Sequence, residues 1–200
     1  MSRGGIRIIG GRWRGRRLAV PPGKGLRPTP DRVRETLFNW LSARVAGARC
    51  LDLYAGSGAL GLEALSRGAA AAVLVERAGP VVRHLREQVA TLGAEGATVI
   101  QADARRFLEG EVAAAGGPFD LVFLDPPFDS GLLDPAMAAL EAGGWLAAGA
   151  AIHVESPSGA EEPAWLDRPA TPQWSSTTPS TCIESWTSTV KISWHGSNRA

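Results

Sequence analysis

Residues 51–61, with the sequence Leu-Asp-Leu-Tyr-Ala-Gly-Ser-Gly-Ala-Leu-Gly, constrain the fold more than any other stretch. A short apolar run ends in glycines, and a leucine-rich segment follows. This pattern predicts a strand, a tight turn and a helix, the unit with which open α/β sheets hold nucleotides. Glycines allow the sharp turn and let the backbone approach a ligand closely. The spacing also matches the G-x-G-x-x-G dinucleotide fingerprint, which is a weak signal when it stands alone.

Asp52 narrows the choice of ligand. A pyrophosphate at a helix N-terminus needs positive potential, and a carboxylate just before the turn opposes it. S-adenosylmethionine carries an ammonium and a sulfonium and has no phosphate, so Asp52 favours this cofactor over NAD. The structural alternative is an aspartate that only caps the turn.

The length of 200 residues suits one α/β domain with a small appendage. The formal net charge is only +1, but eight cationic residues precede the first acidic one, Asp31. Such a block is typical of a nucleic-acid-binding arm or of a solvated tail. The two cysteines and three histidines lack the spacing of a zinc site or a disulfide framework. No apolar run is long enough to span a membrane, and we expect a metal-free cytoplasmic protein.

Basic and apolar residues alternate over residues 3–20, which predicts a small hairpin that turns at Gly10-Gly11 or at Gly15. Trp13 lies among arginines, a combination suited to stacking on bases and pairing with phosphates. The alternative is a solubilising tail with Trp13 packed on the domain.

A first helix is predicted after residue 29, with Thr29 as N-cap, Pro30 at the first position and Asp31 near the positive end of the dipole. Four apolar residues share one face of it: Val33, Leu37, Trp40 and Leu41. Arg32 and Arg34 lie off that face, so the start of the helix is the part with a candidate function.

Further strands are predicted at 70–75, 97–100, 119–124 and 150–155, with helices at 80–92 and 133–141. Glu76 ends the second strand, where an acidic residue accepts hydrogen bonds from ribose hydroxyls. Asp103 follows the third strand, and it either bonds an adenine amino group or caps the next helix.

The fourth strand leads into Asp125-Pro126-Pro127-Phe128. Two consecutive prolines force a stiff, extended exit and remove two backbone donors, which leaves carbonyl oxygens exposed. A carboxylate, a rigid carbonyl and an aromatic plane therefore meet at one strand end, close to the glycine turn.

With these stretches the chain resembles the RsmD-type bacterial methyltransferases, which modify a guanine N2 in 16S ribosomal RNA. The match covers residues 3–156 and rests on the motifs at 7–15, 27–35, 51–61 and 125–128. It implies a Rossmann-like class I methyltransferase fold with a seven-stranded sheet, order 3-2-1-4-5-7-6, strand seven antiparallel. It also implies S-adenosylmethionine as cofactor and, as partner, 16S rRNA in the small ribosomal subunit or an assembly intermediate. We expect a monomer.

The expected organisation is a basic arm (1–26), a methyltransferase core (27–156) and an atypical C-terminal segment (157–200). That last segment is rich in Pro, Ser, Thr and Trp, and only residues 189–194 alternate as a strand does. The family closes its sheet with a two-stranded hairpin at this point, so the tail departs from the family pattern.

Three sets of site residues follow. The expected catalytic residues are Asp125, Pro126 and Phe128, the last stacking on the flipped base. The expected cofactor-binding residues are Asp52, Tyr54, Gly56, Gly58, Glu76, Arg77, Asp103 and Ala104. The expected RNA-binding residues are Arg7, Arg12, Trp13, Arg14, Arg16, Arg17, Arg27 and Arg32.

Three other functions are compatible with parts of the sequence. A DNA adenine-N6 methyltransferase could use the same Asp-Pro-Pro-Phe motif, because it also acts on an exocyclic amine. A nicotinamide-dependent oxidoreductase would explain the glycines and Glu76 but not Asp52 or residues 125–128. A non-catalytic RNA-binding assembly protein would need only the arm.

Overall fold

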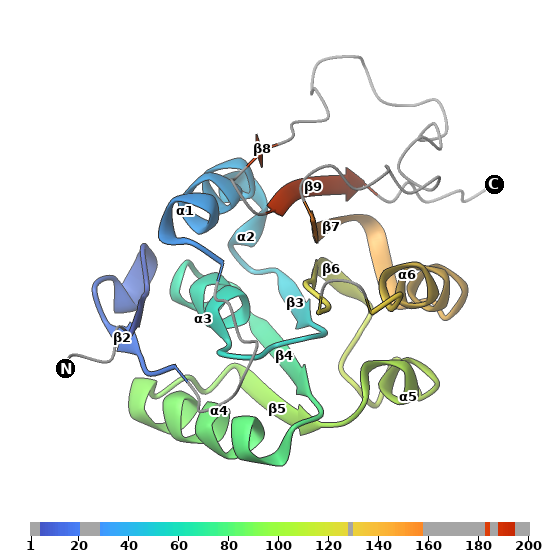
Figure 1. Cartoon of the computed structure of the whole chain (residues 1–200), viewed down its shortest axis with the longest axis horizontal. Helices are drawn as coiled ribbons and strands as arrows, with labels where there is room; N and C mark the ends of the chain where they lie inside the picture. Colours follow the sequence, from blue (N-terminus) through green and yellow to red (C-terminus); the bar gives the residue numbers. More distant parts are fainter. Residues whose placement is uncertain (1–4, 21–28, 128–129, 158–182, 185–187, 195–200) are drawn as a thin grey trace.

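A computed structural model describes residues 5–20, 29–127, 130–157, 183–184 and 188–194. A twisted central sheet lies between two layers of helices (Figure 1). In chain order the elements are β1 (Ile6–Arg7), the 3-10 helix η1 (Gly11–Trp13), β2 (Arg17–Leu18), α1 (Asp31–Trp40), α2 (Ser42–Val45), β3 (Arg49–Asp52), α3 (Ala59–Ser66), β4 (Ala71–Glu76), α4 (Gly79–Leu92), β5 (Ala97–Gln101), α5 (Ala104–Leu108), β6 (Phe119–Leu124), α6 (Leu133–Ala142), β7 (Leu146–Pro157), β8 (Ile183–Glu184) and β9 (Ser188–Trp194).

The strand order of the central sheet is β5-β4-β3-β6-β7-β9-β8. The first five strands are parallel, and β9 runs antiparallel to both β7 and β8. Numbered within the core, this is the predicted order 3-2-1-4-5-7-6. The strand expected at 189–194 is β9, whereas β8 has only two residues and gave no recognisable pattern in the sequence.

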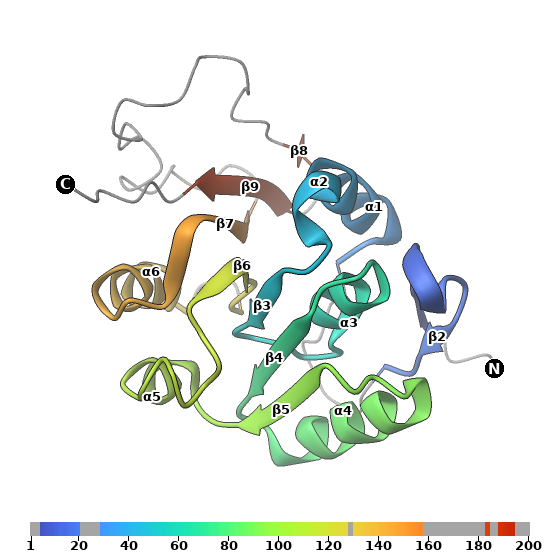
Figure 2. The same ribbon diagram turned by 180° about the vertical axis from the view of Figure 1, so that it is seen from behind.

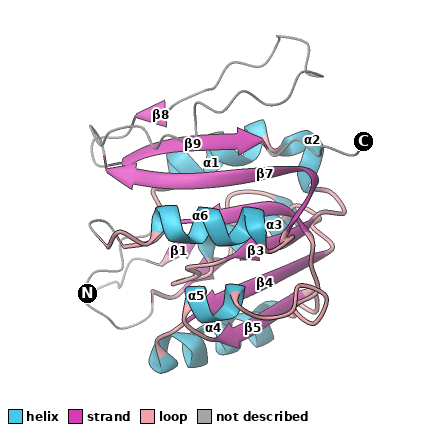
Figure 3. Ribbon diagram, turned by 90° about the vertical axis from the view of Figure 1, so that its right-hand side faces the viewer, coloured by secondary structure: helices cyan, strands magenta, loops and turns pink. Residues whose placement is uncertain are grey.

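The helices cover the two faces separately, with α5 and α6 on one face and α1, α3 and α4 on the other (Figures 2 and 3). Successive side chains of β6 point to opposite faces of the sheet and so contribute to the hydrophobic core on each face. Leu121 and Phe123 pack in the cluster that includes α1 and α3, while Val122 and Leu124 pack in the cluster that includes α5 and α6. Both faces of β6 and its neighbours in the centre of the sheet are therefore buried, as their continuous apolar sequences predict.

Strand boundaries agree with the sequence to within a residue or two, except for β7. This strand begins at Leu146, four residues before the predicted start. Leu146 pairs with Phe119, and the register then shifts before Leu121 pairs with Ala151. The additional residues form an irregularity, which the apolar pattern of a regular strand does not reveal.

The described part of the arm is a hairpin that packs on the domain. In it, Ile6 of β1 pairs with Leu18 of β2, and Gly15 donates its N–H to the Ile8 carbonyl. Ile6, Ile8, Trp13 and Leu18 are all buried in the same core as α3 and α4. These residues therefore form part of the domain core and not a solvated tail.

The prediction of Thr29 as N-cap of the first helix is wrong. The cap residue of α1 is Pro30, with no side-chain hydrogen bond, and its carbonyl accepts the N–H groups of Val33 and Arg34. The Thr29 hydroxyl instead donates to Glu155 Oε1 on β7, at 2.6 Å. Tertiary structure outcompeted the local bond because Glu155 is a buried acceptor in need of a donor.

Candidate active site

The glycine turn joins β3 to α3, and two of its glycines have conformations that other residues rarely adopt. Gly56 has φ 50° and Gly58, the N-cap of α3, has φ 74°. A Cβ on Gly58 would lie 2.7 Å from Leu85 Cδ2, and one on Gly61 would lie 2.2 Å from Leu74 Cδ2. The last glycine of the motif therefore allows α3 to pack closely on β4.

Asp52 ends β3 with a carboxylate that is almost fully buried. Its Oδ2 accepts the N–H of Gly61 in the first turn of α3, at 3.0 Å, so the carboxylate bonds to the helix that follows the glycine turn. Burial raises the pKa of Asp52 to about 7; the Gly61 hydrogen bond lowers it and the Glu76 charge raises it further. Within the described residues no arginine or lysine pairs with this carboxylate. A cationic ligand would supply the missing charge.

The next two strand ends carry the other predicted cofactor-binding residues. Glu76 bridges the turn, accepting the Gly56 N–H at 3.2 Å and the Ala78 N–H at 2.7 Å. Asp103 accepts the Arg105 N–H at 3.1 Å, so the helix cap expected as its alternative role is present. Burial, and then the charge of Asp103, raise the pKa of the half-buried Tyr54 to about 12. Arg77 is exposed and Ala104 is buried.

Asp125 directly follows β6, the strand that pairs with β3 on the side opposite β4. Its side chain is half-buried and Pro126 is buried. Burial, the charge of Glu155 and the charge of Asp52, in that order, raise the pKa of Asp125 well above its usual value. The structure thus brings the predicted catalytic carboxylate into the same electrostatic environment as Asp52. Phe128 lies outside the described residues.

Two polar residues of β7 at this end of the sheet were not predicted from the sequence. Glu155 and His153 are both buried, and His153 Nε2 lies 3.5 Å from Glu155 Oε1. Neither ring nitrogen of His153 has a hydrogen-bond partner among the described residues; its ring meets Phe123 edge-on. The available signal was two polar residues at alternate positions in an apolar strand, both facing the same side.

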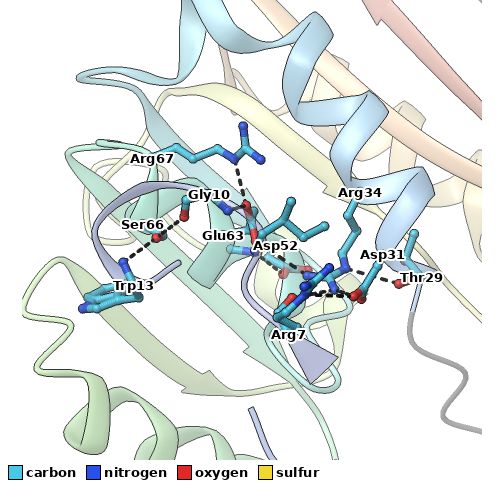
Figure 4. Close-up of polar contacts among 12 residues, drawn as sticks. Arg7, Gly10, Trp13, Thr29, Asp31, Arg34, Asp52, Glu63, Ser66 and Arg67 are labelled. Carbon is cyan, nitrogen blue, oxygen red and sulfur yellow. Dashed lines mark hydrogen bonds and ion pairs between the residues drawn. The ribbon is translucent and has the colours of Figure 1, made fainter. Parts of the chain in front are cut away.

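The anchor of the arm on the domain was not predicted from the sequence either. The carboxylate of Glu63 on α3 is completely buried, and it accepts the N–H groups of Ile9 and Gly10 at 2.8 Å each (Figure 4). Arg67 Nε donates to the same carboxylate at 2.8 Å. Glu63 is thus the acceptor on which the Ile-Ile-Gly-Gly segment of the arm docks.

Arg34 is the counterpart of Glu63 on α1. Its guanidinium is fully buried, lies 3.7 Å from Glu63, and donates to the Arg7 carbonyl at 2.8 Å and the Thr29 carbonyl at 3.2 Å (Figure 4). It also pairs with Asp31. The sequence placed Arg34 off the apolar face as a functional candidate, but its contacts are those of a buried structural residue.

Six of the predicted RNA-binding arginines are exposed: Arg7, Arg12, Arg14, Arg16, Arg17 and Arg32. Arg27 lies outside the described residues. Trp13 is only 8% exposed, and its backbone N–H donates to Ser66 Oγ at 3.0 Å. The Arg12 guanidinium lies 4.0 Å from the centre of the Trp13 ring. Trp13 therefore packs on the domain in the way the alternative prediction described, and Arg12 is the outward-facing member of the pair.

Neither a metal site nor a membrane-spanning helix is found among the residues that the structure describes. In the ranges it describes, no group of three or more His, Cys, Asp or Glu side chains could hold a metal ion. Over the same ranges, no helix is long and apolar enough to cross a membrane.

Known proteins resemble the chain in both sequence and structure. The model of the family described as "Conserved hypothetical protein 95" matches residues 6–173. The protein named ribosomal RNA small subunit methyltransferase D from Escherichia coli K12 is 56% identical over 153 residues, 76% of this chain and 75% of that protein. Its namesake from Haemophilus influenzae is 45% identical over 157 residues, 78% of this chain and 80% of its own length.

Solved structures agree with this. The structure of the putative methyltransferase yhhF from Escherichia coli superposes with a TM-score of 0.79 at 45% identity, over 98% of this chain and 100% of that one. An RNA methyltransferase from Salinibacter ruber, solved with S-adenosyl-L-homocysteine, has a TM-score of 0.61 at 17% identity over 87% of this chain and 97% of its own, which shows the shared fold alone. With its sheet order, its glycine turn and these relatives, the chain belongs to the family of RsmD-type methyltransferases.

Proposed function

We propose that this protein transfers a methyl group from S-adenosylmethionine to the exocyclic N2 of a guanine in 16S rRNA. The main observation that supports this proposal is that β3 and β6 are paired parallel strands. Asp125-Pro126 follows β6, and the glycine turn follows Asp52 at the end of β3. Relatives named for methylation of small-subunit ribosomal RNA support the substrate class. The proposed setting is a cytoplasmic monomer acting on the small subunit or an assembly intermediate.

The residues at the β3 and β4 ends suit this cofactor. Asp52 is a buried carboxylate without a cationic partner in the described part of the chain, and a bound ammonium or sulfonium would relieve its burial cost. Glu76 already receives two backbone N–H groups and has lone pairs left for ribose hydroxyls. We assign Tyr54, Gly56, Gly58, Arg77, Asp103 and Ala104 to the same site. When bound, the cofactor supplies an electrophilic methyl group on a good leaving group, so no metal is needed.

Asp125 and the Pro126 carbonyl act on the amine. The lone pair of the guanine N2 is delocalised into the ring, which makes it a poor nucleophile. The Asp125 carboxylate and the Pro126 carbonyl would accept hydrogen bonds from the two N–H groups of the amine. These bonds would draw the nitrogen toward a tetrahedral shape and direct its lone pair at the methyl group. Positioning of this kind supplies a large share of an enzyme's acceleration. Phe128 would stack on the flipped base.

The exposed arginines of the arm and of α1 would hold the RNA. The side chains of the arm arginines emerge from a hairpin that Glu63, Ser66 and Arg34 fix on the domain. A fixed basic surface would position the RNA by contacts with its phosphates, as contacts with the nucleic-acid backbone do in other protein complexes. In this proposal Trp13 supports Arg12 and does not itself stack on a base.

The direct test is tritium transfer from labelled S-adenosylmethionine to undermodified small subunits, followed by nucleoside analysis. We expect label in N2-methylguanosine of 16S rRNA. Label in N6-methyladenine of DNA would instead support the DNA methyltransferase, and RNA binding without any transfer would support the assembly protein. Tight binding of a nicotinamide cofactor in place of S-adenosylmethionine would support the oxidoreductase.

Substitution at Asp125 tests the mechanism. Asparagine keeps an acceptor oxygen and nearly the same shape, whereas alanine removes the acceptor. Because orientation needs only an oxygen lone pair, we expect Asp125→Asn to retain measurable turnover and Asp125→Ala to lose nearly all of it. If proton acceptance dominates, both variants will fall together, by roughly 10²–10⁴-fold. Cofactor affinity, measured by calorimetry, should change little in either variant. Near-normal methylation by Asp125→Ala would rule out the proposed site.

A further inference from the structure

Glu155 lies beside Asp125 on the neighbouring parallel strand. Leu124 of β6 is in register with Val154 of β7, and Asp125 and Glu155 are the next residues of the two strands. The Glu155 side chain is only 5% exposed. Two acidic side chains at adjacent strand ends therefore share an environment with little water, in which like charges interact strongly.

Thr29 holds Glu155 in this position. The Thr29 hydroxyl donates to Glu155 Oε1 at 2.6 Å, and the Thr29 carbonyl accepts a hydrogen bond from the buried Arg34. The segment before α1 is thereby fixed to the end of β7. The short hydrogen bond holds the Glu155 carboxylate in one orientation.

Among the described residues, the charged groups nearby are acidic except for His153, which forms an ion pair with Glu155 when it is protonated. Asp52 on β3 and Glu76 on β4 are acidic, and His153 on β7 contacts Glu155 at 3.5 Å without a hydrogen bond. On the α1 side, Arg34 is committed to Asp31, Glu63 and backbone carbonyls. No arginine or lysine among the described residues pairs with Asp125 or Glu155.

We propose that Glu155 is a positioning residue that acts through Asp125: fixed by Thr29, it keeps a negative charge beside Asp125 and so makes Asp125 the proton acceptor of methyl transfer. The proposal rests on the proposed function. The new C–N bond uses the nitrogen lone pair, and the C–S bond breaks with its electrons going to sulfur. The N–H bond then breaks, its electrons stay on nitrogen, and a carboxylate oxygen of Asp125 forms the new O–H bond.

This role adds to the orienting role of Asp125 and supplies only part of the rate, so Asp125→Asn should still turn over faster than Asp125→Ala. Burial and then the like charge of Glu155 raise the pKa of Asp125, which makes it a better base than an ordinary aspartate. A base works best when its pKa is near the working pH. An orienting oxygen alone would not need a second buried carboxylate next to it.

The test is the pH dependence of single-turnover methyl transfer with saturating cofactor. Glu155→Gln keeps an oxygen for the Thr29 hydroxyl but removes the charge. We expect the acidic midpoint of the rate to move down by about 1 pH unit, with cofactor affinity unchanged. Thr29→Val should move it in the same direction by a smaller amount. Glu95→Gln, the same change at an exposed site, is the matched control and should leave the midpoint unchanged.

A second measurement keeps the proposal testable without turnover. The carboxyl carbon of Asp125, assigned by comparison with Asp125→Asn, can be titrated by NMR in ligand-free protein labelled with carbon-13 aspartate. Its midpoint should fall in Glu155→Gln, or in Thr29→Val if the first variant does not fold. Midpoints equal to those of the unmodified protein in both measurements would overturn the inference. Absence of methyl transfer by the unmodified protein would instead refute the proposed function, while the NMR titration still decides the role of Glu155.

Discussion

At the scale of single residues, burial disfavours ionisation of the carboxylates at the strand ends of the active site. Asp52 is buried without a cation to pair with it in the described part of the chain, and its pKa is raised to about 7 from 3.8. Between these two pH values the folded protein holds a proton that the unfolded chain has released. The free energy of unfolding therefore falls as the pH rises from about 4 to about 7 and is level above that, as far as Asp52 is concerned.

Asp52→Asn should remove this pH dependence, because asparagine is neutral at every pH and still accepts the Gly61 N–H. Relative to the unmodified protein, the ligand-free variant should gain stability as the pH rises from 4 to 7, with a slope approaching about 1.4 kcal/mol per pH unit. Thermal unfolding at a series of pH values measures this difference. The control Glu95→Gln should give a curve parallel to that of the unmodified protein. A parallel curve for Asp52→Asn would mean that folding does not change the pKa of Asp52. In the same variant, S-adenosylmethionine should bind more weakly.

At the scale of elements, the arm depends on α3. Ser66 Oγ accepts the Trp13 N–H at 3.0 Å and donates to the Gly10 carbonyl, while Glu63 accepts two more N–H groups of the arm (Figure 4). Trp13, Glu63 and Ser66 are buried, so their polar groups need these partners. A hairpin with two-residue strands cannot stand alone; its fixed shape comes from the helix on which it docks.

Ser66→Ala should loosen the arm while leaving the sheet intact. It leaves the Trp13 N–H and the Gly10 carbonyl without the hydroxyl that bonds to both, which should cost about 1–3 kcal/mol. Hydrogen exchange at the Trp13 amide should accelerate far more than exchange at the amides of β3 and β4. Ser42→Ala, on the exposed start of α2, is the control and should change neither. Equal acceleration in the arm and the sheet would show that the arm does not open separately.

At the scale of the whole molecule, the arm gives the domain a basic surface that its net charge of +1 conceals. Replacing Arg12, Arg14, Arg16 and Arg17 by glutamine should weaken rRNA binding and flatten its salt dependence. For every phosphate that the arm no longer neutralises, the slope of log affinity against log salt concentration should become shallower by about 0.7–0.9. Binding titrations at several salt concentrations measure the slope. Cofactor affinity should be unchanged.

The matched control replaces Arg105 and Arg106, two exposed arginines of α5 on the opposite face of the sheet. It should change the slope less per arginine than the arm variant does. Equal changes per arginine would mean that the arm contributes only general positive charge.

The sequence by itself determined the parallel core and the chemistry at its strand ends. Apolar runs, glycines and prolines act over a few residues, so the strand at 119–124, the turn after Asp52 and the Asp-Pro-Pro exit could all be predicted. The strand order came from resemblance and was confirmed. Only the tertiary structure decided which side chains far apart in the sequence meet. Arg34 was predicted as a functional candidate and Thr29 as a cap, because Arg7 lies 27 residues from Arg34 and Glu155 lies 126 residues from Thr29. The physical reason is that a buried polar group bonds to whatever partner the fold brings near it, and local pattern carries no record of that partner.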